Sequence, residues 1–541
     1  MWEIHNHEVA GSIPAPATKR KSRPHHRSLL FCFDTHMKKW MIIILTLFMT
    51  LTSAAQSTFR RGPGCWRTAD ARKQAAARHS SLRRAGATGY FGKKKGLVIL
   101  AEFPDKKFKT GHDRAKYLDI LNQPGYTTAE GFNGSVADYF RDQSNGLFEL
   151  EFDVVGPYTT KRNFAYYGEN DDNGSDKHPE EMIVEMCKAA DAEVNFADYD
   201  WDGDFIVDEV FVVYAGKGET NGGSAKAIWP HMWTLTSAGQ YLMLDQRLID
   251  VYACSDELMS NNNINGIGTF CHEFSHCLGL PDFYDVVNGD EFGMSDFDVM
   301  DQGCHAGSGF SPVCYTAYER MYCGWKNLIT LGNEDLTVDS LTSTYDHGDA
   351  YILRNDAYPD EYYIIEYRQR KGWDTFLPSE GLMITHVDYD ENVWDINTPN
   401  SIYNSAVARE QGYTVTNDHQ RMTIFHADNK DTYWTVATDL YPNRSNDSLT
   451  ATSKPAATLY HKNSQGLKTM TGAILDIRKN SDGTMAFRYR AHPPVADAIR
   501  ELEYIDTASP RIYTLDGRYV GTAFNALPRG IYIINGKRVI R

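Results

Sequence analysis

The chain has 541 residues, enough to bury several hydrophobic cores, so about two to four domains are expected rather than one. The formal net charge of −16 is unevenly spread. Residues 1 to 95 hold 18 of the 55 Lys and Arg residues but only 4 of the 71 Asp and Glu residues, which leaves 37 against 67 in the remainder. Such an acidic body repels phosphate backbones, and no basic stripe with interleaved aromatic residues appears. Nucleic-acid partners are therefore disfavoured, whereas calcium use is compatible with this charge.

Residues 37 to 56 have the pattern of a secretory signal peptide. They read MKKWMIIILTLFMTLTSAAQ, with two lysines, an apolar run and small residues at the end. The apolar run is shorter than the roughly 20 residues that a membrane-spanning helix needs. We expect residues 37–55 to be a signal peptide that exports the protein. Translation is then expected to start at Met37, which leaves residues 1–36 untranslated.

Residues 56 to 95 form a short basic segment ahead of the acidic body. Its many Arg and Lys residues suit a pro-segment that lies over the functional site until it is cut. A flexible leader is the alternative, because the ends of domains are commonly poorly ordered.

Residues 198 to 209 read DYDWDGDFIVDE and satisfy the twelve-residue calcium-loop pattern, with Gly203 at position 6. The carboxylates expected to bind a structural calcium ion are Asp198, Asp200, Asp202, Asp204 and Glu209, with Asp204 or Asp208 adjusting the ligand set. The following run, VFVVYAG, is typical of a strand, so we expect an isolated loop entering a sheet rather than a helix pair. A solvated acidic loop is the alternative.

The most specific motif lies in residues 266 to 285, GIGTFCHEFSHCLGLPDFYD. On an α-helix, His272 and His276 lie one turn apart on the same face, so both imidazoles can reach one metal ion. Glu273 can then reach a water molecule in an open coordination position without being a ligand. This is the HExxH arrangement of zinc peptidases, and a helix with two hydrogen-bonded histidines is the alternative.

A third ligand follows the helix at a fixed offset. Gly279 lets the chain leave the helix with a positive φ, and the returning segment brings Asp282 toward the histidines. Three protein ligands and one water indicate a catalytic zinc site, since structural zinc is usually closed by four protein ligands. In such a site Glu273 is expected to take a proton from the attacking water and deliver it to the leaving amine.

The stretch HEFSHCLGLPDFYD resembles the active site of the immune inhibitor A family of bacterial zinc metallopeptidases. Similar segments are GLVILAEFPD (97–106), SVADYFRDQSNGLFELEFDVVGPY (135–158), IWPHMWTL (228–235) and EYRQRKGWDTFLPSEGLMITHVDY (366–389). The resemblance implies a metzincin-like fold in which a methionine turn floors the metal site, and Met300 in SDFDVMDQG matches that methionine. Many metzincins have histidine as third ligand, and some have a tyrosine two residues after the methionine. This chain has Asp282 and Gln302 there, so no oxyanion-stabilising tyrosine is assigned.

Cysteines cluster near the candidate site. They are Cys254, Cys271, Cys277, Cys304, Cys314 and Cys323. In an exported protein this clustering favours disulfides, although the sequence does not give their pairing. Cys65 in the basic segment is either an ordinary cysteine or a zinc-binding thiolate that keeps the precursor latent.

After residue 330 the sequence has strand character, in AYILRN, EYYIIEYRQ, GLMITHVDY and GTMAFRYR. We predict an α+β protein: a metzincin-like zinc peptidase catalytic domain in residues 96–330, a β-sandwich in 331–490 and a small C-terminal β module in 497–541. That last module resembles the sorting domains of the type IX secretion system. A β module with a packing role is the alternative.

The predicted function is a secreted or cell-surface zinc endopeptidase, made as a precursor and stabilised by calcium. Proteins or peptides would be its substrates, secretion machinery would bind its C-terminal module, and a monomer is expected. The alternative is a cell-surface binding or adhesive β-sandwich protein whose metallopeptidase-like domain is inert. Complete retention of His272, Glu273, His276 and Asp282 favours the enzyme.

Overall fold

The structure is a computed structural model of the chain. It describes residues 90–172, 174–444 and 446–492, and residues 512–541 apart from 516, 517, 522, 535 and 536. The predicted signal peptide, most of the predicted pro-segment and Cys65 lie outside the described residues. Within the described ranges, no helix combines the length and the apolar character needed to cross a membrane.

A five-stranded sheet forms the centre of the region with the HExxH motif. In spatial order its strands are β2 (Phe148–Thr159), β1 (Gly92–Glu102), β4 (Val210–Tyr214), β8 (Val251–Asp256) and β5 (His231–Thr234). The first four run parallel, whereas β5 is antiparallel to β8 and forms one edge. The predicted strand in VFVVYAG is confirmed as β4. All five of its residues are buried, as expected of a parallel strand covered on both faces.

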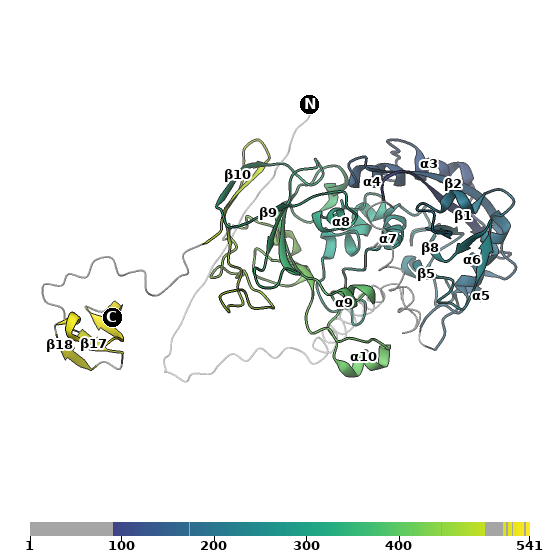
Figure 1. The fold of residues 1–541 in the computed structure, drawn as a ribbon. Coiled ribbons are helices and arrows are strands. Elements are labelled where there is room, and N and C mark those ends of the chain that lie inside the picture. The colour runs from purple at the N-terminus through teal and green to yellow at the C-terminus, as the bar shows by residue number, and fades with distance from the viewer. Residues whose placement is uncertain are drawn as a thin grey trace, which may run out of the picture. The chain divides into compact units, whose positions relative to one another are not determined.

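Helices pack on both faces of this sheet (Figure 1). One group comprises α3 (Arg114–Asn122), α4 (Val136–Gln143) and α7 (Gly268–Cys277), and the other comprises α5 (Phe164–Gly168) and α6 (Pro179–Ala190). The alternation of side chains along β1 divides the core between them. Val98 and Leu100 pack with the first group, and Leu97 and Ile99 with the second. The HExxH helix α7 is thus held in the interior, against β8 and β5.

The sheet begins earlier than the predicted domain boundary at residue 96. Strand β1 starts at Gly92, and its lysines pair in parallel register with the acidic start of β2. Lys95 Nζ lies 3.1 Å from Asp153 Oδ2, and Lys93 Nζ lies 3.8 Å from Glu149 Oε2. The three lysines of GKKKGLVIL therefore belong to the strand and not to the basic segment before it, because each charge can extend into solvent while the backbone stays in the sheet.

Two further sheets follow in the chain. The larger contains β14 (Met422–Ile424), β13 (Gly381–Asp388), β12 (Glu361–Arg368), β11 (Tyr351–Arg354) and β9 (Ile329–Thr330) in spatial order. The smaller contains β10 (Leu336–Leu341), β16 (Met485–Arg490) and β15 (Ala473–Lys479). The strands predicted in AYILRN, EYYIIEYRQ, GLMITHVDY and GTMAFRYR are confirmed as β11, β12, β13 and β16.

The larger of these sheets is buried on both faces. Tyr363 and Ile384 share a core with Phe487 of the smaller sheet. On the opposite face, Ile364 and Met383 belong to the same core as α7 and α8 (Ala317–Tyr322). The predicted boundary at residue 331 divides the sequence, but the hydrophobic core continues across it.

Shorter elements complete the described chain. They are the sheet of β3 (Ile206–Val207), β7 (Arg247–Ile249) and β6 (Leu242–Leu244), and the helices α9 (Glu391–Asp395) and α10 (Ser405–Gln411). Single 3₁₀ turns occur at Phe196–Tyr199, Glu219–Asn221, Ser295–Phe297, Gly372–Phe376, Tyr433–Thr438 and Phe524–Ala526, and an interrupted one at Gln302–Gly309.

The C-terminal residues form a separate antiparallel sheet. Its strands, in spatial order, are β18 (Tyr519–Gly521), β17 (Ile512–Thr514), β19 (Ile531–Ile534) and β20 (Lys537–Ile540). Its small core consists of Ile512, Tyr532, Ile534 and Val539. A β module therefore exists where the sequence predicted one.

The predicted disulfides are not present among the described residues. Seven cysteines are described, all of them buried and none in a disulfide, at positions 187, 254, 271, 277, 304, 314 and 323. Cys254 is an example, since it lies inside β8 and packs with the core on the α6 side of the sheet. These cysteines cluster because they fill a core as small apolar side chains.

Candidate active site

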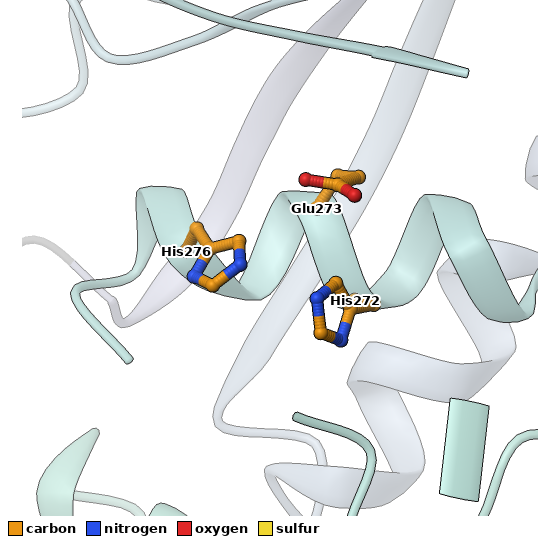
Figure 2. Close-up of side chains that lie close together, drawn as sticks. All are labelled: His272, Glu273 and His276. Atoms are coloured by element: carbon orange, nitrogen blue, oxygen red, sulfur yellow. The ribbon is translucent and has the colours of Figure 1, made fainter. Parts of the chain in front are cut away.

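The two histidines of the motif come from consecutive turns of α7. Figure 2 shows His272 and His276 one turn apart, with Glu273 between them along the helix. His272, Glu273 and His276 each bring a potential ligand atom within 4.8 Å of the others. All three side chains are buried, with at most 5% of each residue exposed. The predicted helix is confirmed, and it places these polar groups in the protein interior.

Hydrogen bonds fix the ring orientation of both histidines. His272 Nδ1 donates to the Val299 carbonyl oxygen at 2.8 Å, and His276 Nδ1 donates to the Leu280 carbonyl oxygen at 2.8 Å. A carbonyl oxygen can only accept, so the proton of each neutral ring lies on Nδ1. Both Nε2 lone pairs are then available to a metal ion, as is usual for metal-binding histidines.

Asp282 reaches the histidines because the chain turns sharply after α7. Gly279 has φ 92°, and a Cβ atom at this position would lie 2.9 Å from the Tyr322 hydroxyl. That hydroxyl donates to the Gly279 carbonyl oxygen at 2.7 Å. The turn requires glycine for both its backbone conformation and its close contact.

The three predicted ligands converge through one carboxylate oxygen. Asp282 Oδ1 lies 3.1 Å from His272 Nε2 and 3.3 Å from His276 Nε2. Burial alone would raise the pKa of Asp282, but the neighbouring imidazoles of His276 and His272 lower it well below its usual range. The carboxylate is therefore ionised in this arrangement.

Glu273 is also buried but lacks such a partner. Within the described part of the chain, its Oε2 atom accepts no hydrogen bond. Burial raises the pKa of Glu273 to about 7, although His272 and His276 oppose this shift. A carboxylate with a pKa near neutrality can accept and release a proton under physiological conditions.

The methionine predicted to floor the site, Met300, belongs to the same hydrophobic core as the apolar residues of α7. Met300 is fully buried, and its carbonyl oxygen accepts a hydrogen bond from the Phe283 amide at 2.9 Å. Its neighbour Val299 supplies the carbonyl oxygen that orients His272. The turn thus contacts His272 and also the segment that carries Asp282.

Asn397 was not predicted from the sequence. Its side-chain Oδ1 accepts a hydrogen bond from the Asp282 amide at 2.6 Å, and its Nδ2 donates to Asp282 Oδ2 at 2.6 Å. It lies 115 positions further along the chain, and no local pattern marks it. Only the packing of the downstream segment against the one that carries Asp282 brings the two residues together.

The predicted calcium loop brings together a different set of carboxylates. Asp200, Asp202 and Asp208 each place an oxygen within 4.8 Å of the others. Asp200 Oδ2 also lies 2.6 Å from Arg247 Nε, and Asp200 Oδ1 accepts a hydrogen bond from the Gly203 amide at 2.8 Å. The loop is therefore compact and acidic, with one arginine beside it.

Asp198, Asp204 and Glu209 do not join this group. Asp198 Oδ2 lies 3.7 Å from Lys95 Nζ, and Asp204 Oδ1 accepts a hydrogen bond from the Ile206 amide. Glu209 directly precedes β4, and its side chain turns into the core, where burial raises its pKa well above the usual range. Asp208, and not Glu209, therefore lies with Asp200 and Asp202.

Comparison with known proteins agrees with the geometry. Residues 84–327 match the family model for the immune inhibitor A peptidase M6 catalytic domain. The pre-pro-metalloprotease PrtV of Vibrio cholerae serotype O1 is 28% identical over 272 residues, which cover 42% of this chain and 29% of PrtV. Immune inhibitor A of Bacillus thuringiensis subsp. alesti is 26% identical over 322 residues, which cover 49% of this chain and 45% of that protein.

The chain spans less than half the length of either relative. Within the matched residues 84–327, helix α7 and Asp282 form one buried site, and α7 packs against β8 and β5 of the five-stranded sheet. Residues 84–327 are therefore similar to the catalytic domain of the immune inhibitor A (M6) peptidases.

Proposed function

We propose that this chain is a zinc-dependent endopeptidase that hydrolyses peptide bonds in proteins. The observation that carries the proposal is the convergence of His272 Nε2, His276 Nε2 and Asp282 Oδ1, with the unpaired Glu273 oxygen beside them. The alternative is an adhesive protein with an inert peptidase-like domain. It does not explain why all three ligand residues are present and why each is oriented by a further hydrogen bond, at His272 Nδ1, His276 Nδ1 and Asp282 Oδ2.

The donor set fits zinc in both chemistry and size. Zinc in catalytic sites takes nitrogen and oxygen donors at about 2.0–2.1 Å, and a tetrahedron with such bonds separates neighbouring donors by about 3.3 Å. The separations of 3.1 and 3.3 Å between Asp282 Oδ1 and the two Nε2 atoms agree with that edge. His272, His276 and Asp282 would hold the ion, and a fourth position would remain for water and substrate.

When bound, zinc lowers the pKa of a coordinated water toward neutrality and polarises the scissile carbonyl group. The chain supplies the proton transfers. Glu273 accepts the proton of the attacking water and then delivers it to the nitrogen of the leaving amine. Its own position between the two histidines, buried and without a competing donor to Oε2 among the described residues, suits that role. Met300, which is fully buried in the same core as the apolar residues of α7, would form the floor of the site.

Export is the second part of the proposal. The pattern of residues 37–55 supports a signal peptide. The basic segment of residues 56–95, which precedes an acidic body, supports synthesis as a precursor. The small β module of residues 512–541 is compatible with recognition by secretion machinery. We propose a monomer that acts outside the cell or at its surface.

The proposal predicts casein-hydrolysing activity in the culture fluid of cells that produce the full chain. Adding 1,10-phenanthroline should abolish the activity, and excess zinc should restore it, because the chelator removes the ion that the three ligands hold. Hydrolysis that persists in the chelator would contradict a zinc enzyme. Activity confined to the cells would contradict export.

We also propose that Asp200, Asp202 and Asp208 bind a structural calcium ion. Three carboxylates in one turn repel each other, and Arg247 neutralises only part of that charge, so a hard divalent cation would stabilise the loop. The loop leads through β3 into the strand β4, so its order supports the catalytic sheet.

Calcium is expected to raise the melting temperature of chelator-treated protein. Free calcium at about 100 times its dissociation constant stabilises the folded state by about 2.7 kcal/mol, a shift of several degrees. The matched variant Asp202→Asn should lose this response while folding normally in EGTA, because Asp202 is exposed. Differential scanning calorimetry provides the measurement. An unchanged melting temperature on calcium addition to the unsubstituted protein would show that the loop is no calcium site.

A further inference from the structure

Asn397 contacts both the backbone and the side chain of the third predicted metal ligand. Its Oδ1 accepts from the Asp282 amide and its Nδ2 donates to Asp282 Oδ2, both at 2.6 Å. Asn397 lies well beyond residue 327, where the family match ends. We propose that Asn397 is a positioning residue that holds Asp282 for metal binding and so sets the zinc affinity of the site. This inference rests on the zinc function proposed above.

The contact divides the two oxygens of Asp282 between separate tasks. Oδ2 is taken by the Asn397 amide, whereas Oδ1 faces both His272 Nε2 and His276 Nε2. The carboxylate cannot rotate without losing a buried hydrogen bond, so it presents a single oxygen to the metal. Hydrogen-bonded partners of this kind orient metal ligands and tune their affinity.

Asparagine meets two requirements at this position. Its φ is 59°, in the left-handed region that asparagine adopts more readily than most residues. Its side-chain amide also offers an acceptor for the Asp282 backbone amide and a donor for the Asp282 carboxylate. Aspartate would keep the shape and the acceptor but lose the donor. Glycine would keep the backbone conformation but lose both.

The segment that carries Asn397 is itself fixed. The Asn397 amide donates to the Trp394 carbonyl oxygen at 3.0 Å, and the Trp394 indole donates to the Tyr318 hydroxyl of α8 at 2.8 Å. Three residues later, Asn400 Nδ2 donates to the carbonyl oxygen of Phe283 at 2.8 Å. Phe283 is the residue that follows Asp282 in the chain. Asn397 is therefore held rigidly against the metal-binding segment, and a rigid support is what makes such positioning effective.

The residues around Asn397 belong to the catalytic core. Val393 and Trp394 pack in the same hydrophobic core as Phe283 and Met300. The polypeptide downstream of the family match thus contributes to the wall of the metal site. Its role in the proposed enzyme extends beyond attachment or targeting.

The test compares zinc binding by full-length variants Asn397→Gly and Asn397→Asp with the unsubstituted protein. Zinc dissociation constants are measured by competition with a chromogenic chelator, and ligand geometry by the visible spectrum of the cobalt-substituted forms. We expect the dissociation constant to rise about 10- to 100-fold in Asn397→Gly. It should rise further in Asn397→Asp, where two carboxylates would face each other. Both cobalt spectra should change.

A matched control separates positioning from general loss of stability. Asn355 is equally buried, and its side chain hydrogen-bonds Glu361, His461 and Ala357, away from the metal ligands. Asn355→Ala should lower the melting temperature yet keep the zinc affinity and cobalt spectrum of the unsubstituted protein.

Three results would overturn the inference. A zinc dissociation constant of Asn397→Gly equal to that of the unsubstituted protein would show that the side-chain amide does not position Asp282. A zinc dissociation constant of Asn397→Asp equal to that of the unsubstituted protein would show that the shape of the side chain is enough to position Asp282, without the donor. An equal loss in Asn355→Ala would assign the effect to stability. If the unsubstituted protein bound no zinc, the proposed function itself would fail, and this inference with it.

Discussion

Replacing Glu273 by glutamine is expected to lower kcat/KM for casein by about 10²- to 10⁴-fold, the range measured for general acid–base groups. Glutamine keeps the size of the side chain but cannot accept a proton from water. Zinc content should stay at one ion per chain, since the ligands His272, His276 and Asp282 are untouched. The comparison requires purified protein with its metal content determined by mass spectrometry.

The same variant separates catalysis from binding. Because the buried Glu273 side chain would act only on the water and the leaving amine, kcat should fall while KM for a peptide substrate changes little. Turnover close to that of the unsubstituted enzyme, in a preparation free of other peptidases, would remove Glu273 from its role. Loss of zinc together with activity would instead indicate a structural or ligand role.

Replacing Arg368 by methionine is expected to destabilise the fold by about 3–5 kcal/mol, the cost of breaking a buried ion pair. Arg368 is fully buried, and its guanidinium donates to both oxygens of Asp374 at 2.9 and 2.8 Å. It also donates to the carbonyl oxygens of Phe297 and Cys314. Methionine would leave the Asp374 carboxylate buried without its counter-charge.

A double-mutant cycle checks this assignment. Replacing Arg368 by methionine together with Asp374 by leucine removes both charges, so the double variant should be more stable in urea than the arginine variant alone. Since Phe297 and Cys314 flank the methionine turn, the single variant should also lose activity through a looser metal site. A single variant as stable as the unsubstituted protein would mean that the pair contributes nothing to the fold.

The local parts of the site could be predicted from the sequence because they depend on short-range rules. The helical repeat places His272 and His276 on one face, and a glycine with positive φ follows at residue 279. The β-branched run of β4 likewise predicts a buried strand. These features require knowledge of only a few neighbouring residues.

The missed parts depend on contacts between distant segments. Asn397 meets Asp282 through a contact between segments 115 positions apart, and no pattern near Asn397 indicates that contact. The loop pattern counts positions and therefore includes Glu209, whereas the structure buries Glu209 before β4 and brings Asp208 to Asp200 and Asp202. The clustered cysteines suggested disulfides, but the described ones are buried thiols whose spacing reflects core packing.

The most direct measurement of the central claim is an anomalous difference map at the zinc absorption edge, from crystals of the purified protein. We expect one strong peak, within about 2.0–2.2 Å of His272 Nε2, His276 Nε2 and Asp282 Oδ1, with water as the remaining neighbour. No peak at these atoms, or a peak whose fourth position is filled by another side chain of the mature protein, would contradict a catalytic zinc site.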